Sequence, residues 1–393
     1  MRNQPTNNIN DSIKSDIVDI KLLLLTKGID IDSESIGEYF SDFEKRYKVN
    51  SLKVSDRHFV DSEDDLRHYI PDELILKDGQ QITVSKVYYR KESKIILAAD
   101  ENGLMLIDKL SSDEYPIDIF PVERALHCFE KINNFNLNDY VNVVGLDRVS
   151  IIPYDDCENW CLGYPCKFCG ANPNRLKSSN EKPNVTEIKD YNNDTLLWWN
   201  SNRDRTLEGI REGIKVLVKK SCIKPHFHLM FMSGNLVEKD IEWHILLDVI
   251  NEVSKIIDLS KVDSYVIAMP PDNFSYIEKA YEMEIKNIAF NLGCFDYNHF
   301  KKVCPGKEML YGYENIIQSL ERCVNIFKEG NVRTNFVLGS EPIPYLKKGV
   351  EILAEKGIVS DYSIFFPRRA SIWKNRCSPK PEDILDFSDI LVY

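Results

Sequence analysis

Apolar and polar positions follow two alternating patterns from about residue 144 onward. Longer segments in which apolar residues return every three or four positions, as at Ile241, Ile245, Val249 and Val253, are typical of helices. Between them lie short, mostly apolar runs that are typical of strands. Six such runs occur, at 149–154, 226–232, 265–269, 287–292, 333–338 and 362–366. This α/β repetition predicts parallel strands joined by crossover helices, arranged as an open sheet or an incomplete barrel.

Several of these runs carry polar residues at every second position. A strand covered on both faces should be apolar throughout, so the alternation indicates that the two faces of the sheet differ. The polar positions on one face are His226, His228, Asn287, Asn291, Arg333 and Asn335. We expect helices to pack on the apolar face and the other face to line a polar cavity that holds a ligand. The alternative is a set of hydrogen-bonded polar groups inside an ordinary core.

The first 130 residues follow a different pattern. Residues 1–14 are polar and rich in Asn, and we expect a disordered tail there. Residues 16–47 show helical periodicity. The segments that follow are short, apolar and β-branched, with charged turns between them, at 81–90, 94–99 and 104–107. They are typical of antiparallel strands in a meander.

These changes of pattern divide the chain into parts. Residues 15–130 are predicted to form a small α+β accessory domain that contains the antiparallel meander. Residues 144–372 form the strand–helix domain, and residues 373–393 form a C-terminal tail that packs on it. The accessory domain fits the role of a lid, a substrate-recognition unit or a dimer contact.

Charge and hydropathy exclude some functions. The chain has 50 Lys and Arg against 62 Asp and Glu, a net charge of −12, which argues against broad binding of nucleic acid or membrane surfaces. Leu22–Leu25 is the longest leucine run, far short of the ~20 apolar residues that a spanning helix needs. The polar N-terminus lacks the apolar centre of an export signal. We therefore predict a cytoplasmic protein without a membrane partner.

Cysteines form the most specific feature of the sequence. Four of the ten lie within thirteen residues, at Cys157, Cys161, Cys166 and Cys169, directly after the first predicted strand of the strand–helix domain. In parallel α/β folds, ligand-binding loops gather at the edge where strands end. Thiolates are soft ligands for zinc or for iron–sulfur clusters. Structural zinc usually takes two cysteine pairs with two residues inside each, and only Cys166 and Cys169 have that spacing.

Phe168 stands directly before Cys169, and Gly170 follows it. With these neighbours, the loop resembles the signature of the radical S-adenosylmethionine (radical SAM) superfamily. That signature has three cysteines, separated by three and then two residues, with an aromatic residue before the last. This chain departs from it, because four residues separate Cys161 from Cys166.

The resemblance covers residues 144–372 and implies an incomplete (β/α)6 barrel. It implies a [4Fe–4S] cluster whose thiolate ligands hold three irons and leave the fourth for SAM. The ligand set it favours is Cys161, Cys166 and Cys169, with Cys157 as the competitor for the first position. Cys294 and Cys304 are interpreted as structural buried thiols.

The resemblance also implies where SAM binds. The turn Ser233-Gly234-Asn235 closes the second strand, where the family places small residues near the methionine amino group, and Gly339 follows the fifth strand, near the adenine. The full set of implied contacts is Phe168, Ser233, Gly234, Asn235, Asn291, Arg333, Asn335 and Gly339. Each also fits an ordinary role as a turn, a strand-end cap or an ion-pair partner.

The implied function is reductive cleavage of SAM, in which the 5′-deoxyadenosyl radical abstracts hydrogen from a small metabolite or natural-product intermediate. It requires an external electron donor such as flavodoxin or ferredoxin. Alternatives within the superfamily are modification of a peptide or tRNA, and cleavage of another carbon–sulfur bond of SAM for group transfer. The alternative outside enzymes is a zinc-stabilised binding protein in which all four thiolates close one metal site.

Overall fold

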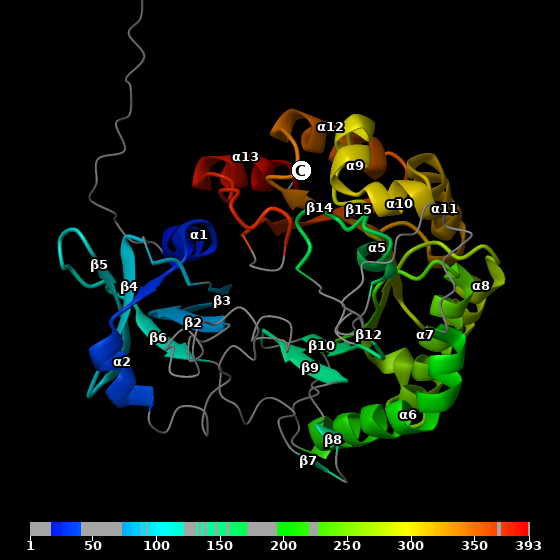
Figure 1. Ribbon diagram of the computed structural model, residues 1–393, viewed down its shortest axis with the longest axis horizontal. Coiled ribbons are helices and arrows are strands. Elements are labelled where there is room, and N and C mark those ends of the chain that lie inside the picture. The colour runs from blue at the N-terminus through cyan, green and yellow to red at the C-terminus, as the bar shows by residue number, and fades with distance from the viewer. Residues whose placement is uncertain are drawn as a thin grey trace, which may run out of the picture.

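The chain folds into two groups of elements, each built around its own sheet (Figure 1). The computed structural model describes residues 17–40, 73–87, 89–91, 93–121, 131–132, 135–136, 140–145, 148–154, 157–170, 195–219, 227–367 and 371–391. The tail predicted for residues 1–14 lies outside the described residues, as does His226.

The N-terminal group combines two helices with a six-stranded sheet. Its helices are α1 (Ile17–Lys27) and α2 (Ser33–Phe40). Its strands are β1 (Asp30–Ile31), β2 (Glu73–Asp78), β3 (Gln81–Lys86), β4 (Ile95–Asp100), β5 (Gly103–Asp108) and β6 (Asp118–Pro121). Ile20 and Leu24 of α1 are fully buried in one cluster with Leu76 and Leu97 of the sheet. Burial of these side chains therefore holds the helix on the sheet.

The order of the strands in this sheet differs from a simple meander. Strands β2 and β3 form one antiparallel hairpin, and β4 and β5 form another. The sheet order is β1-β4-β5-β6-β2-β3, so β6 lies between the two hairpins and β1 pairs with β4 in parallel. Periodicity predicts single strands and their hairpins, because these depend on neighbouring residues, but it carries no information on which hairpins become neighbours. A separate two-stranded ladder joins β7 (Lys131–Ile132) and β8 (Phe135–Asn136).

The second group is built on a seven-stranded sheet. Its strands are β9 (Val141–Val144), β10 (Arg148–Ile151), β11 (His228–Met232), β12 (Asp263–Ala268), β13 (Asn287–Phe290), β14 (Val332–Leu338) and β15 (Ile358–Ile364). Strands β10 to β15 pair in parallel and in chain order, and β9 adds an antiparallel edge next to β10. Each of the six predicted strand regions overlaps one of these parallel strands, and the last shares only residues 362–364 with β15.

Helices lie between successive parallel strands along the chain, and the last helix, α13, follows β15. They are α5 (Glu158–Cys161), α6 (Thr195–Lys219), α7 (Lys239–Ser254), η6 (Leu259–Lys261), α8 (Ser275–Glu282), α9 (Tyr297–Val303), α10 (Pro305–Leu310), α11 (Tyr313–Phe327), α12 (Ile343–Ala354) and α13 (Pro381–Leu391). The apolar positions Ile241, Ile245, Val249 and Val253 lie on α7, which also contributes Trp243 and Leu246 to the core.

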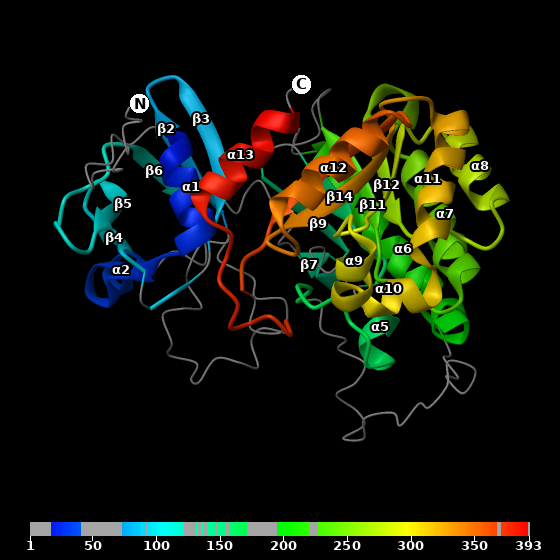
Figure 2. The same ribbon diagram turned by 90° about the horizontal axis from the view of Figure 1, so that it is seen from above.

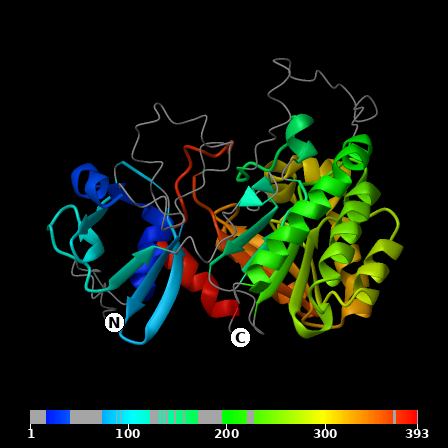
Figure 3. The same cartoon turned by 90° about the horizontal axis from the view of Figure 1, so that it is seen from below.

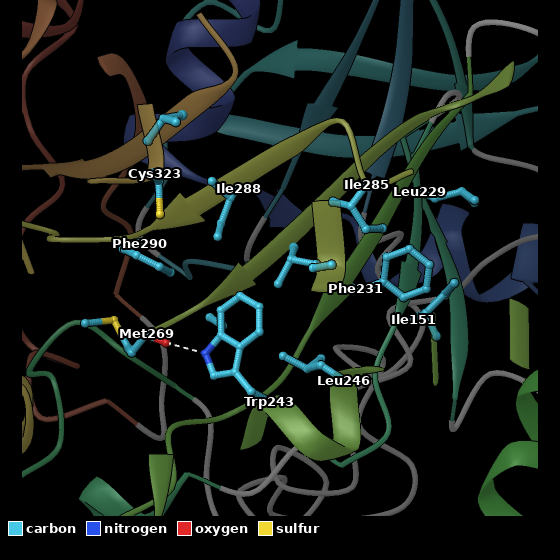
Figure 4. Packing of buried hydrophobic residues seen from close by; sticks show 14 of the residues in the cluster. Ile151, Leu229, Phe231, Trp243, Leu246, Met269, Ile285, Ile288, Phe290 and Cys323 are labelled. Carbon is cyan, nitrogen blue, oxygen red and sulfur yellow. Dashed lines mark hydrogen bonds between the residues drawn. The ribbon is translucent and has the colours of Figure 1, made fainter. Parts of the chain in front are cut away.

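The two faces of the seven-stranded sheet differ, as the alternation of polar residues predicts. Phe231, Ile288 and Phe290 are fully buried among helix side chains, and the Trp243 indole N–H donates to the Met269 carbonyl at 2.8 Å (Figure 4). On the opposite face the alternate residues of β11 and β12 remain half-exposed. The helices therefore cover one face, and polar side chains occupy much of the other.

Contacts join the two groups of elements. The Glu73 carboxylate of β2 accepts hydrogen bonds from the Gly145 amide at 3.0 and 3.2 Å. Helix α13 lies between α1 and α12 (Figure 2), and Lys347 of α12 pairs with Asp386 of α13 at 2.7 Å. The view from the opposite side shows the same two groups side by side (Figure 3). None of the helices in the described ranges is long and apolar enough to cross a membrane.

Candidate functional site

The cysteine loop, residues 157–170, starts just beyond the C-terminal end of β10 and is fixed to the turn that follows β11. The Glu158 amide donates to the Asn235 carbonyl at 2.8 Å, and the Tyr154 hydroxyl donates to the Gly234 carbonyl at 3.1 Å. The Glu158 carboxylate accepts from the Val237 amide at 2.6 Å. The structure thus brings the predicted turn at 233–235 next to the start of the cysteine loop.

The second half of the loop packs against α9 and α10. The Lys167 amide donates to the Val303 carbonyl at 2.9 Å, and the Gly306 amide donates to the Tyr164 carbonyl at 3.0 Å. A Cβ on Gly306 would lie 2.5 Å from the Tyr164 carbonyl oxygen and 2.6 Å from the Asn159 side chain. Only glycine therefore fits where α10 meets the loop.

Phe168, the aromatic residue of the motif, packs between two other segments. Its ring centroid lies 6.4 Å from that of Trp373. A Cβ on Gly293, whose φ is +84°, would lie 3.0 Å from the Phe168 ring. The Trp373 amide also donates to the Lys167 carbonyl at 3.0 Å, so the chain near residue 373 closes over this part of the loop.

Two further thiols lie beside the loop. Cys304 forms thiol–thiol hydrogen bonds with Cys166 and with Cys294, and its Sγ atom lies 3.7 Å from the Leu292 carbonyl oxygen. The hydrogen bond from Cys304, and to a smaller extent the charge of Lys307, lower the pKa of Cys166 to about 7, although burial opposes this. A lowered pKa favours the thiolate, which is the form that ligates metals.

Lys307 is the cation of this site, and only 9% of its surface is exposed. Its ammonium group donates to the Asn291 carbonyl, and among the described residues no carboxylate lies within salt-bridge distance of it. Burial alone would lower the pKa of Lys307, but nearby thiolates outweigh burial and raise it. The thiol groups that contribute are Cys166, Cys304, Cys157 and Cys169. In the other direction, the charge of Lys307 favours the thiolate form of Cys166.

Cys157 lies close enough to the other thiols of the loop to remain a candidate ligand. Burial raises the pKa of Cys157, and the negative charges of Cys169 and Cys166 raise it further, which places these three thiols within electrostatic reach of one another. Cys161, at the end of α5, is half-buried. Direct substitution of each cysteine therefore decides between Cys157 and Cys161.

The spacing of the thiols bears on which metal group fits. Among the described residues, which include all four cysteines of the loop, no three thiol Sγ atoms lie within 4.8 Å of one another. A tetrahedral zinc site with Zn–S bonds of about 2.3 Å needs Sγ atoms about 3.8 Å apart. An iron–sulfur cube distributes its thiolates over separate irons and holds them further apart. As they lie here, the described thiols are therefore too far apart for a single zinc ion bound by three of them.

Glu242, which the sequence analysis missed, lies behind the turn at 233–235. Its Oε1 atom accepts from the Ser233 hydroxyl at 3.2 Å, and its buried Oε2 atom has no hydrogen-bond partner within normal geometry among the described residues. Burial raises the pKa of Glu242 to about 8, so the carboxyl is largely protonated at neutral pH. Acidic residues are common in the first turn of a helix, and Glu242 lies in the first turn of α7. The sequence therefore gave no reason to single it out.

The remaining predicted contacts fall at both ends of the strands. Asn291 follows β13 and holds Lys307, and Gly339 follows β14 with a φ of +93°. Arg333 lies at the start of β14, where it pairs with Asp361 at 3.2 Å. It is therefore about 16 Å along the strand from the edge that carries the cysteine loop. The structure does not bring Arg333 to the loop, whereas Asn335 lies between, with its carbonyl accepting from the Gly293 amide at 2.8 Å.

Comparison with known proteins gives one short similarity. No family model matches the chain. Over 99 residues the chain is 33% identical to bacteriochlorophyllide c C-7(1)-hydroxylase from Chlorobaculum limnaeum. The match spans about a quarter of this chain and about a quarter of that protein. Similarity to a hydroxylase supports an enzyme rather than a binding protein.

Proposed function

We propose that this protein is a radical SAM enzyme whose cysteine loop holds a [4Fe–4S] cluster. The observation that carries the proposal is the group of thiols that faces Lys307, a buried cation without a carboxylate partner in the described residues. When bound, such a cluster supplies the electron that cleaves SAM to methionine and a 5′-deoxyadenosyl radical, which removes hydrogen from a substrate.

The chain's own residues have distinct roles in this proposal. Cys166 and Cys169 bind iron together with Cys161 or Cys157. The turn at 233–235 and the carboxyl of Glu242 receive the methionine end of SAM. We further propose that the seven-stranded sheet is the incomplete barrel of this class, with its half-exposed face lining the space for SAM.

The relative and the side chains at the rim of the sheet support one substrate class for the first tests. Bacteriochlorophyllide c is the substrate in the relative's name, and we propose an apolar small molecule of this kind as the first substrate to test. Large exposed side chains occupy segments that follow the strand ends, among them Tyr164, Tyr297, Tyr345 and Ile372. Such side chains can pack against the face of a flat apolar ligand.

The test is anaerobic purification and reconstitution of the full chain, followed by measurement of iron, sulfide and zinc. Addition of a one-electron reductant and SAM should then release 5′-deoxyadenosine and methionine in equal amounts. Cleavage of another bond would release 5′-methylthioadenosine instead, and would move the assignment to group transfer. One zinc per chain with no release of either nucleoside would refute the proposal and favour the zinc-binding alternative.

A further inference from the structure

Three ligand-type side chains converge beyond the C-terminal ends of β13 and β14, outside the cysteine loop itself. They are Asp296, His299 and Glu341, and their ligand atoms all lie within 4.8 Å of one another. In the part of the chain that the structure describes, no other group of three His, Cys, Asp or Glu residues meets this condition. The three come from two separate connections, since Asp296 and His299 belong to the start of α9 and Glu341 precedes α12.

Each of the three side chains is held in place by its surroundings. Asp296 caps α9 by accepting from the His299 amide at 3.0 Å, and the same oxygen lies 2.9 Å from the His299 Nδ1 atom. The His299 ring packs on Tyr345, with centroids 5.4 Å apart. Glu341 accepts hydrogen bonds from the backbone amides of Phe295 and Asp296. The ligand atoms are therefore fixed before any ion arrives.

His299 is the basic side chain of this group and lies 2.9 Å from Asp296. Glu341 is only 6% exposed, and among the described residues no Lys or Arg nitrogen forms a salt bridge with Glu341 or Asp296. A carboxylate oxygen has two lone pairs, so one amide bond to each oxygen leaves room for a metal.

We propose that Asp296, His299 and Glu341 bind one divalent transition-metal ion, as a site separate from the cysteine loop. One imidazole and two carboxylates form a nitrogen and oxygen donor set suited to Mn²⁺, Fe²⁺ or Zn²⁺ rather than to soft Cu⁺. Three protein ligands leave coordination positions for water or for an oxygen of a substrate. The proposal goes beyond the radical SAM function and does not depend on it.

The test uses the full chain, treated with chelator and left without iron. Mn²⁺ is the probe because thiolates compete poorly for it, and binding is followed by the loss of the free-ion EPR signal and by calorimetry. We expect one Mn²⁺ per chain. Glu341→Gln and His299→Gln should each weaken binding about tenfold or more.

Two controls keep this test specific. Asp263→Asn alters the His228–Asp263 contact of 2.7 Å, an Asp–His pair without a third ligand, and should leave Mn²⁺ binding unchanged. Cys166→Ala should also leave it unchanged, so that failure of the cluster and failure of this site are distinguishable. Circular dichroism melting identifies variants that do not fold. The proposal is overturned if the chain binds no stoichiometric Mn²⁺, or if folded Glu341→Gln and His299→Gln proteins bind it as tightly as the unaltered chain.

Discussion

Cys166 and Lys307 form a buried pair in which each group favours the charged form of the other. The exposed fractions are 8% for Cys166 and 9% for Lys307. The charge of Lys307 contributes to the lowered pKa of Cys166, and Cys166 is the strongest of the thiols that raise the pKa of Lys307. The pair joins a loop after β10 to a helix after β13, so the site depends on the fold of the whole sheet.

Removing the buried cation should make the cluster harder to reduce. Lys307→Met keeps the length of the side chain and deletes its charge, so the added electron loses a stabilising neighbour. We expect a reduction potential that is more negative by about 59 mV or more, which corresponds to a tenfold change in a one-electron equilibrium. Redox titration followed by EPR measures this potential. Lys302→Met on the exposed side of α9 is the matched control, and an equal shift in both variants would contradict the role of Lys307.

The ligand set is decided by single substitutions. Cys166→Ala and Cys169→Ala should each abolish the iron content and the visible absorbance of the reconstituted protein, because each removes a thiolate ligand. Only one of Cys157→Ala and Cys161→Ala should do the same. Cys377→Ala, at an exposed thiol outside the loop, should retain full iron content. Full iron content in Cys166→Ala would show that the loop does not hold the cluster.

Glycine at position 306 allows the cysteine loop to sit against α10. Gly306→Ala should displace the Tyr164 carbonyl, because the new Cβ would lie 2.5 Å from that oxygen. We expect a loss of about 1–3 kcal/mol in the free energy of unfolding and a several-fold lower iron content. Gly163→Ala within the loop meets no atom within 4 Å but places alanine at a φ of +80°, so it measures backbone strain in the loop without a steric contact. Normal iron content in Gly306→Ala would show that this contact does not position the loop.

Protonation of Glu242 links stability to pH. Its pKa is about 8 in the folded chain, because burial disfavours the charge, against 4.5 for an unperturbed carboxyl. Between these two values the folded state keeps a proton that the unfolded state has lost, so stability falls as pH rises. Glu242→Gln should remove up to about 1.4 kcal/mol of this loss per pH unit. Urea unfolding from pH 5 to 8 measures the slopes, and parallel slopes for the two proteins would contradict the assignment.

Periodicity alone was enough to locate the six parallel strands and to assign the two faces of β11 and β12, whereas β13 is buried on both faces, Asn287 included. Residues such as Phe231 and Met230 differ in burial because successive side chains point to opposite faces. The same rule did not place Arg333 correctly. Arg333 shares a face with Asn335, but sharing a face does not determine how far along the strand a residue lies. Arg333 lies at the beginning of β14, where it pairs with Asp361.

The residues that surround the cysteine loop in the fold could not be predicted from the sequence. Cys304 and Lys307 are more than a hundred residues from Cys166 along the chain, and they reach it because α9 and α10 pack on the loop. No local spacing encodes such a contact. Glu341 was likewise not singled out, because its partners are backbone amides of another connection.

The EPR spectrum of the reconstituted, reduced protein, recorded before and after addition of SAM, tests the central claim most directly. We predict the signal of a reduced [4Fe–4S] cluster, with g values that shift when SAM occupies the iron that has no thiolate. The loss of this signal in Cys169→Ala would tie it to the loop. A spectrum without such a signal, or one that SAM leaves unchanged, would contradict the account.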